Sequence, residues 1–257
     1  MTSKVIVITG ASSGIGAALA RRLGAEGHAL ALAARSREQL EAVAAECGTR
    51  AKVFTADVTK RAEVERLRDD AIAAFGQVDV WVNNAGRGIN RSVQELTDEE
   101  FDEMMLINAK SALYGMQAIA PHFIARGEGH LINVSSVLSR VPAATFRSAY
   151  SAAKAALNVL TANFRMDVQA AHPKIAVSLV LPGSVPGAFQ KNSLGGTPSV
   201  VPRGVPAPPQ TPEDVAAVIA NLLEHPAPEA YTRPELRAIA GRYHEDVGAF
   251  ERSLVSQ

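Results

Sequence analysis

A glycine-rich turn between an apolar strand and an alanine-rich helix constrains this fold more than any other feature. Its three segments run together along the chain: KVIVIT (4–9), TGASSGIG (9–16) and GIGAALARRLGAEG (14–27). Gly10 permits a tight turn, while Gly14 and Gly16 let the backbone approach a phosphate and let the helix pack on the strand. The helix start offers free N–H groups and a positive dipole end to an anion. This order of elements predicts a dinucleotide-binding site.

Short apolar runs rich in β-branched residues alternate with longer Ala, Leu, Glu and Arg segments along the chain. The predicted strands are 4–9, 28–34, 51–57, 78–84, 130–135, 174–182 and 229–232. The predicted helices are 14–27, 37–47, 60–75, 97–108, 111–126 and 148–170. Thr97, followed three residues later by Glu100, is a capping signal. The alternation predicts an α/β fold of one Rossmann-like, doubly wound domain over 1–257, with a mostly parallel sheet and helices on both faces.

Composition argues against several classes of partner. The 26 Lys and Arg residues balance 26 Asp and Glu residues, so no overall charge favours nucleic acid or an anionic membrane. No stretch approaches the ~20 apolar residues of a membrane span, and the first apolar run is too short for a signal peptide. Cys47 is the only cysteine, and the six histidines show no close ligand pairing. We expect a cytoplasmic protein with a small-molecule partner and no nucleic acid, membrane or metal.

The end of the second predicted strand indicates which dinucleotide binds. An acidic residue about 20 residues after the glycine turn would hold the ribose 2′-hydroxyl of NAD, but no Asp or Glu lies between Gly27 and Arg37. Arg35 stands there instead, and a guanidinium pairs well with the 2′-phosphate of NADP. We predict NADP (NADPH), with NAD less favoured and Ser36 and Arg37 assisting. After the third strand, Asp57 either accepts from the adenine amine or caps the following helix.

The segment from 184 to 211 differs from the rest of the chain. It is rich in proline and glycine and shows no apolar periodicity. It is either a long surface loop or a flexible lid over a binding site. We favour the lid, because the segment follows the carboxyl end of a strand, where ligands collect in such sheets.

Four ordered motifs give the chain a family resemblance. They are TGASSGIG (9–16), NNAG (83–86), YSAAK (150–154) and PG (182–183). Together they resemble the compact branch of the short-chain dehydrogenase/reductase family. The resemblance implies a seven-stranded sheet, a nicotinamide cofactor, an Asn–Ser–Tyr–Lys active site and a homo-oligomer, either a tetramer or a dimer. The turn and the resemblance together predict these cofactor-binding residues: Gly10, Ser12, Ser13, Gly14, Ile15, Gly16, Arg35, Asp57, Val58, Asn83, Ala85, Gly86, Tyr150, Lys154, Pro182, Gly183 and Val185.

The resemblance also implies a role for each catalytic residue. The matching residues are Asn108, Ser136, Tyr150 and Lys154. Tyr150 exchanges a proton with the carbonyl or alcohol oxygen, and Lys154, one helical turn away, lowers the pKa of Tyr150 and holds the nicotinamide ribose. Ser136 hydrogen-bonds the same oxygen, with Ser135 as the rival for this role. Asn108 positions a water that links Lys154 to solvent.

The two asparagines of NNAG have different expected tasks. We expect Asn83, together with Gly86, to lie near the cofactor. We expect Asn84 to brace the sheet instead of touching the cofactor.

Two departures from the family pattern affect the predicted site. Ser136 and Tyr150 are 14 residues apart, one more than is usual in the family; we expect the loop between them to absorb the extra residue as an altered substrate wall. The family's PGxVxT is PGSVPGAF here, so Gly187 stands where a threonine meets the nicotinamide carboxamide. Backbone groups at Val185 remain available, but Pro186 lacks an N–H and stiffens the turn. We expect weaker cofactor binding or a differently placed lid.

These observations predict an NADP(H)-dependent oxidoreductase that interconverts a ketone or aldehyde and an alcohol. The predicted substrate wall comprises 87–96, 137–147, Val185 and the lid, and its apolar residues favour a moderately hydrophobic carbonyl compound. The alternative is a non-catalytic NADP-binding regulatory or structural protein of the same fold, which Gly187 supports. The intact set of four catalytic residues favours the enzyme.

Overall fold

Seven strands form one sheet in the computed structural model, which describes residues 3–195 and 209–255. The strands are β1 (Val5–Thr9), β2 (Ala29–Ala34), β3 (Ala51–Thr55), β4 (Val80–Asn83), β5 (Gly129–Val134), β6 (Ile175–Leu181) and β7 (Glu229–Tyr231). Their order is β3-β2-β1-β4-β5-β6-β7, and every neighbouring pair is parallel. The predicted α/β, doubly wound fold with seven strands is confirmed. The assignment of 1–257 to one domain stays a prediction.

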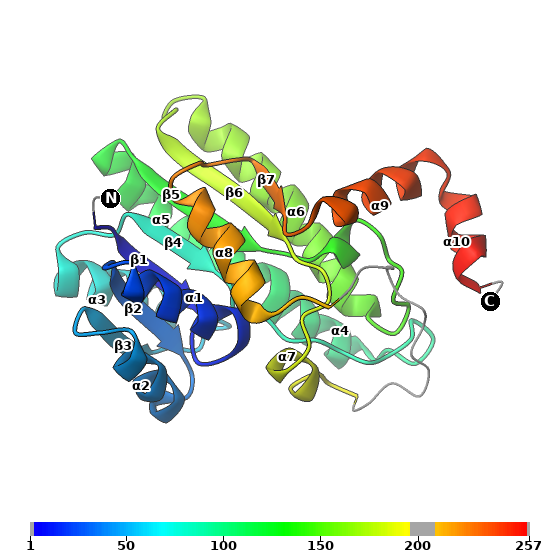
Figure 1. Ribbon diagram of the computed structural model, residues 1–257, viewed down its shortest axis with the longest axis horizontal. Helices are drawn as coiled ribbons and strands as arrows, with labels where there is room; N and C mark the ends of the chain where they lie inside the picture. Colours follow the sequence, from blue (N-terminus) through cyan, green and yellow to red (C-terminus); the bar gives the residue numbers. More distant parts are fainter. Residues whose placement is uncertain (1–2, 196–208, 256–257) are drawn as a thin grey trace.

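Helices cover both faces of the sheet (Figure 1). One face carries α1 (Gly14–Ala25), α2 (Arg37–Glu46) and α8 (Pro212–Leu222). The other carries α3 (Arg61–Phe75), α5 (Ser111–Arg126) and α6 (Ser148–Gln169). The remaining elements are α4 (Asp98–Met105), the π-helical turn η1 (Leu106–Lys110), the 3-10 turn η2 (Val137–Ser139), α7 (Ala188–Lys191), α9 (Pro234–Glu245) and α10 (Val247–Val255).

The side chains of β1 alternate between two hydrophobic cores. Ile6 and Ile8 pack with residues of α1, α2 and α8, whereas Val5 and Val7 pack with residues of α3, α5 and α6. Alternate side chains of a strand point to opposite faces of the sheet. Because helices cover both faces, every position of β1 is buried. This explains the continuous apolar run in its sequence.

The predicted helix over 97–108 divides into two conformations. Thr97 Oγ1 accepts from the backbone N–H of Glu100, and the Glu100 carboxylate accepts from the N–H of Thr97, so the predicted capping box is present. The α-helix ends at Met105 and continues as the π-helical turn η1, which contains Asn108. Such turns are often found at functional sites.

Helix α8 has a start signal that our sequence analysis did not use. Thr211 Oγ1 accepts from the N–H of Asp214, the Asp214 carboxylate accepts from the N–H of Thr211, and Pro212 occupies the first turn. Proline and a capping box are both typical of a helix start. The same rule that predicted the start of α4 therefore also predicts α8.

The described parts of the chain show neither a membrane-crossing helix nor a metal cluster. No helix within 3–195 and 209–255 is long and apolar enough to cross a membrane. In the same ranges, no group of three or more His, Cys, Asp or Glu side chains is placed to hold a metal ion. Cys47 is buried, and its thiol donates to the carbonyl oxygen of Val43 at 3.1 Å.

His130 is a buried histidine between β5 and β6. Its Nε2 lies 2.8 Å from Oγ of Ser178, whose hydroxyl donates to the carbonyl oxygen of Ala227 at 2.7 Å. With the Ser178 proton used there, Nε2–H of His130 is the donor to Ser178. Burial lowers the pKa of His130 from 6.5 to about 4, and the charge of Lys4 acts in the same direction.

We expect His130 to make folding stability depend on pH. As the pH falls, the unfolded chain protonates this histidine first, so stability is lost from about pH 6.5 down to about pH 4. The loss over this window is roughly 3 kcal/mol. His130→Gln keeps an N–H for Ser178 but does not titrate, so it should lose less stability on acidification. Urea unfolding of both proteins at pH 7 and pH 5 measures the difference.

His28 and His122 serve as internal controls in that comparison. Burial lowers the pKa of each of them, but both residues remain in His130→Gln. Their contribution therefore cancels when the two proteins are compared. Equal losses of stability in wild type and His130→Gln would contradict the assignment to His130.

Candidate active site

Side-chain hydrogen bonds join the carboxyl ends of β1 and β4. The strand order reverses between these two strands, which is where such sheets bind ligands. Oγ1 of Thr9 accepts from the backbone N–H groups of Asn84 and Ala85, at 3.0 and 3.2 Å. Nδ2 of Asn84 donates to the carbonyl oxygens of Thr9 and Gly10, at 2.9 and 3.3 Å. Asn84 thus braces the sheet, as expected, and also holds the glycine turn.

The glycine turn leaves the start of α1 open to an anion. Ser13 is the N-cap residue, but its side chain makes no capping bond, and the first turn holds no acidic residue. Gly14 has φ +52°, and a Cβ there would meet nothing within 4 Å. At Gly16 a Cβ would lie 2.3 Å from the carbonyl oxygen of Gly10 and 2.6 Å from Nδ2 of Asn84. The turn therefore suits a phosphate for two reasons. The N–H groups at the start of α1 have no side-chain cap, and the glycines let a ligand come close to the backbone.

The other predicted residues of the turn lie beside this opening. Ser12 and Ile15 are half-buried, and Ser13 is exposed. Ile15 packs against the core under α1 and α8. Ser12 and Ser13 are therefore the side chains of the turn that are placed to reach a ligand.

Arg35 lies exposed after β2, where the sequence predicted it to meet a 2′-phosphate. In the described ranges it forms no ion pair, whereas the nearby Arg37 pairs with Glu41 at 2.7 Å. Asp57 Oδ1 accepts from the N–H and hydroxyl of Thr59, at 3.0 and 2.7 Å. Burial raises the pKa of Asp57, but the Thr59 bonds and nearby cations, Arg35 among them, lower it overall. Asp57 thus caps the turn before α3 and remains ionised beside Arg35.

Asn83 has a different environment from the one we expected. Its Oδ1 accepts from Nε1 of Trp81 at 2.8 Å. Its Nδ2 donates to Oδ1 of Asn133 at 2.9 Å and to the carbonyl oxygen of Ala112 at 3.2 Å. The side chain is buried and braces β4 against β5 and α5. Because the side-chain amide is fully used, only the backbone of Asn83 could contact a cofactor. The proximity of Asn83 to a cofactor stays a prediction.

Gly86, Asn108 and Lys154 converge beyond the end of β4. A Cβ on Gly86 would lie 2.8 Å from Oδ1 of Asn108 and 3.6 Å from Nζ of Lys154. The Asn108 amide bonds both backbone groups of Arg87: Nδ2 donates to the carbonyl oxygen at 2.9 Å, and Oδ1 accepts from the N–H at 3.1 Å. The turn η1 thus directs Asn108 against the loop after β4, beside Lys154.

Ser136, and not its rival Ser135, faces Tyr150. Ser136 is the serine that lowers the pKa of Tyr150, and its Oγ accepts from the N–H of Leu138 at 3.2 Å. Ser135 points into α6, where its hydroxyl donates to Oδ1 of Asn158 at 2.6 Å. The sequence analysis favoured Ser136, and the direction of Ser135 into α6 supports that preference.

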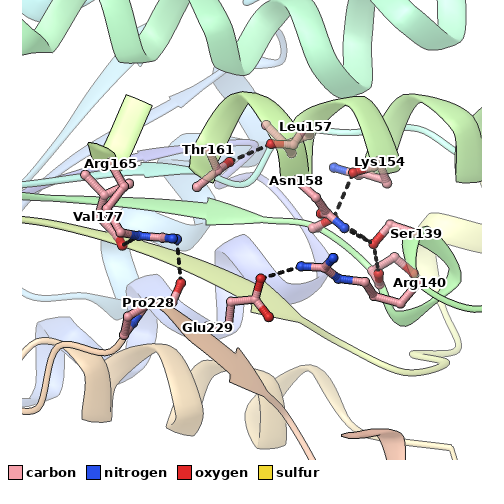
Figure 2. A network of polar contacts seen from close by, with 12 residues as sticks. Ser139, Arg140, Lys154, Leu157, Asn158, Thr161, Arg165, Val177, Pro228 and Glu229 are labelled. Atoms are coloured by element: carbon pink, nitrogen blue, oxygen red, sulfur yellow. Dashed lines mark hydrogen bonds and ion pairs between the residues drawn. The ribbon is translucent and has the colours of Figure 1, made fainter. Parts of the chain in front are cut away.

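A polar network behind Ser136 connects α6 with η2 and β7 (Figure 2). Nδ2 of Asn158 donates to Oγ of Ser139 at 2.7 Å. Arg140, next along the chain, pairs with Glu229 of β7. The turn that carries Ser136 is therefore held from two sides, although none of these contacts is evident from sequence spacing.

Burial dominates the electrostatics of Tyr150 and Lys154. It raises the pKa of Tyr150 to about 12, against smaller lowering effects of the Ser136 hydrogen bond and the charge of Arg147. It lowers the pKa of Lys154 to about 7. Nζ of Lys154 donates to the carbonyl oxygen of Val134 at 2.9 Å and lies 5.9 Å from the centre of the Tyr150 ring. Burial thus moves the two pKa values in opposite directions, and the expected lowering of the Tyr150 pKa by Lys154 stays a prediction.

Comparisons with known proteins agree with this geometry. The family model for short chain dehydrogenase matches residues 4–195. The chain belongs to the short-chain dehydrogenase family. An uncharacterized oxidoreductase of Bacillus subtilis, YxnA, is 34% identical over 247 residues, which cover 93% of this chain and 68% of the relative.

Two solved structures are similar over most of their length. A short-chain dehydrogenase/reductase of Burkholderia phymatum in complex with NAD has 26% identity and a TM-score of 0.85, with 95% of this chain and 94% of that chain covered. A metagenomic short-chain oxidoreductase in complex with NADP has 33% identity and a TM-score of 0.75, with 91% and 98% covered.

The PG motif of this short-chain dehydrogenase is anchored by a glutamine that the sequence analysis missed. The carbonyl oxygen of Pro182 accepts from the N–H of Val137 at 2.8 Å. Oε1 of Gln210 accepts from the N–H of Gly183 at 3.0 Å and from the hydroxyl of Thr232 at 2.6 Å. Gln210 is buried and joins the ends of β6 and β7. No local pattern marks it, because its partners are distant in sequence.

Residues 184–195 and 209–211 of the predicted lid are described, and the first of these two stretches packs over Tyr150. Phe189 in α7 packs edge-on against Tyr150, with 5.2 Å between ring centres. Val185 packs against the first core, and Ile89 pairs with Leu194. The remainder of the predicted lid, 196–208, lies outside the described residues. The covering segment makes Tyr150 a buried residue.

We expect Gly16→Ala to destabilise the protein by roughly 1–3 kcal/mol, because the added Cβ would overlap the carbonyl oxygen of Gly10. Gly241→Ala in α9 is the matched control, since a Cβ there meets nothing within 4 Å. Alanine at that helical position should be neutral or slightly stabilising. Urea unfolding of the two variants measures both effects. An unchanged midpoint in Gly16→Ala would refute the tight packing of the turn.

Proposed function

We propose that this short-chain dehydrogenase is an NADP(H)-dependent oxidoreductase that interconverts a ketone or aldehyde and an alcohol. The observation that carries the proposal is the convergence of Asn108 and Lys154 on Gly86, with Nζ of Lys154 5.9 Å from the centre of the Tyr150 ring. Ser136, at the end of β5, lowers the pKa of Tyr150. A hydroxyl pair of this kind can bind one oxygen atom of a substrate from two sides. The apolar residues packed around Tyr150 favour a moderately hydrophobic substrate.

The chemistry divides between the cofactor and the protein. When bound, the nicotinamide supplies the hydride for reduction or accepts it in oxidation. Tyr150 donates its proton to the carbonyl oxygen in the reduction, and Ser136 donates a hydrogen bond to the same oxygen. With a pKa of about 12, Tyr150 is protonated near neutral pH, as a proton donor must be. Lys154 lies beside Gly86 and Asn108, and in this proposal it holds the nicotinamide ribose.

Arg35 supports NADP over NAD. No carboxylate on the end of β2 competes for its guanidinium, since the nearest residues there are Ala34 and Ser36. Ser36, the next residue after Arg35, caps α2: its hydroxyl oxygen accepts from the N–H of Gln39. Solved relatives are complexes with NAD or with NADP, so the family admits both. The charge at Arg35 is the feature of this chain that favours the phosphorylated cofactor.

We expect Tyr150→Phe to lose activity by roughly 100-fold or more while it still binds NADPH, because the proton donor is lost but the glycine turn is untouched. Absorbance of NADPH, followed with a panel of ketones and aldehydes, measures the rate. Fluorescence of NADPH measures binding in the same samples. NADPH binding by wild type with no turnover of any compound in the panel would favour the non-catalytic alternative.

We expect Arg35→Ala to weaken NADPH binding by about 10- to 100-fold, or roughly 1.5–3 kcal/mol, with little change for NADH. Arg37→Ala is the matched control, because Arg37 is already paired with Glu41. Titration calorimetry of wild type and both variants with NADPH and NADH gives the six dissociation constants. Similar losses for NADPH and NADH in Arg35→Ala would place Arg35 away from the 2′-phosphate.

The proposed homo-oligomer, either a tetramer or a dimer, and the proposed cytoplasmic location rest on the sequence and the family resemblance alone. The predicted substrate class has the additional support of the apolar surroundings of Tyr150.

A further inference from the structure

Asn158 is a buried polar residue of α6 that the proposed chemistry does not use. It is 5% exposed and lies one helical turn after Lys154, on the same side of the helix. Both ends of its side-chain amide have a partner: Oδ1 accepts from the hydroxyl of Ser135 at 2.6 Å, and Nδ2 donates to Oγ of Ser139 at 2.7 Å (Figure 2). These two serines flank Ser136 in the sequence, so one amide holds the chain on both sides of Ser136.

The hydrogen bonds around this amide run in one direction. The hydroxyl of Ser139 donates to the carbonyl oxygen of Ser136, which can only accept. Oγ of Ser139 must therefore accept from Asn158, which places Nδ2 of the amide toward Ser139 and Oδ1 toward Ser135. Oγ of Ser135 also lies 3.3 Å from the carbonyl oxygen of Lys154, but its bond to Asn158 is the shorter one. The chain of donors thus leads from Ser135 through Asn158 and Ser139 to Ser136.

The Ser136 hydroxyl keeps its own proton available. Ser136 is the N-cap residue of η2, and its Oγ accepts from the N–H of Leu138 at 3.2 Å. A hydroxyl that accepts one hydrogen bond still has a proton to donate. In the proposed function a substrate oxygen receives that hydrogen bond. The direction of the proton depends on the backbone of 135–139, from which the side chain projects.

Lys154 connects the same part of β5 to α6. Its Nζ donates to the carbonyl oxygen of Val134 at 2.9 Å, one residue before Ser135. Lys154 and Asn158 therefore form two successive attachments of α6 to the end of β5. Tyr150 lies one turn before Lys154 on the same helix. The helix that carries the proposed proton donor thus also sets the position of Ser136.

The turn after β5 has other anchors that do not involve Asn158. The N–H of Val137 donates to the carbonyl oxygen of Pro182 at 2.8 Å, and Arg140 pairs with Glu229 of β7. Replacing Asn158 should therefore shift the Ser136 side chain without releasing the turn from β6 and β7. A small shift is enough to affect a reaction, since a misplacement of about 1 Å can cost roughly 100-fold in rate.

We propose that Asn158 is a positioning residue, which uses Ser135 and Ser139 to hold the Ser136 hydroxyl in the orientation that the reaction requires. Its catalytic meaning rests on the proposed function. The role is exerted through the turn 135–139 and needs no contact between Asn158 and a substrate. Its loss should therefore lower kcat and leave cofactor binding unchanged.

A test without substrate follows the N–H of Leu138, which bonds Oγ of Ser136. Asn158→Leu has a similar branched shape but no polar group, and should accelerate hydrogen exchange of this N–H, measured by NMR, by about tenfold or more. Thr161→Val is the matched control. Thr161 is buried on the same helix, and its Oγ1 accepts from Nδ2 of Asn133 at 2.8 Å. This variant also removes a bond between α6 and β5, but away from Ser136, so exchange at Leu138 should stay at the wild-type rate.

Two results of the exchange measurement would overturn the proposal. One is an unchanged rate at Leu138 in Asn158→Leu, and the other is an equal acceleration in Thr161→Val. Thermal unfolding checks that each variant folds. If Asn158→Leu does not fold, Ser139→Ala replaces it, because it interrupts the same chain of hydrogen bonds at its other end.

A double-mutant cycle with Ser136 gives the kinetic counterpart. With NADPH and the ketone or aldehyde of the panel that reacts fastest, kcat should fall by about tenfold in Asn158→Leu. The dissociation constant for NADPH should stay within about twofold of wild type, because binding energy at the glycine turn is untouched. In a Ser136→Ala background, Asn158→Leu should cause no further loss, since the residue through which it acts is gone.

A general loss of structure would lower kcat by the same factor in both backgrounds, and that result would overturn the proposal. Thr161→Val should leave kcat unchanged in both. If wild type reduces no compound of the panel, the proposed function fails, while the exchange rate of Leu138 still decides whether Asn158 holds Ser136.

Discussion

The hydrogen bonds of Thr9 and Asn84 across the carboxyl ends of β1 and β4 are the constraint on which the rest of the site depends. Parallel strands end at one edge of the sheet, but nothing in their ladder holds the loops that follow. Here the Asn84 amide bonds the carbonyl oxygens of Thr9 and Gly10, so it fixes the glycine turn. The same segment carries Gly86 against Lys154. The segment 84–86 thus links the glycine turn to the surroundings of Lys154.

Burial has opposite effects on the pKa values of Tyr150 and Lys154. It raises the pKa of Tyr150 and lowers that of Lys154, because each loses hydration of its charged form. A protonated tyrosine and a partly neutral lysine suit the donation of a proton, whereas oxidation needs the tyrosinate. The Ser136 hydrogen bond and the charge of Arg147 oppose the effect of burial on Tyr150. The site therefore balances desolvation against two local stabilising contacts.

Features that depend on local spacing could be predicted from the sequence, and those that depend on side-chain direction could not. The glycine turn, the strands and the capping box at Thr97 follow from periodicity and from neighbours a few residues apart. The preference for Ser136 over Ser135 came from the family resemblance, and only the structure shows which way each side chain leaves the end of β5. Asn83 looked like a ligand contact, yet Trp81 and Asn133 use its amide.

The backbone at Gly187 explains why the family threonine is missing from this chain. Gly187 has φ +125°, a conformation that a β-branched residue adopts only with strain. A Cβ there would meet nothing within 4 Å, so the obstacle to threonine is the backbone itself and not a clash. The glycine leads directly into α7, which places Phe189 on Tyr150 and on the guanidinium of Arg147. The altered motif is therefore part of the arrangement that packs Phe189 against Tyr150 and Arg147.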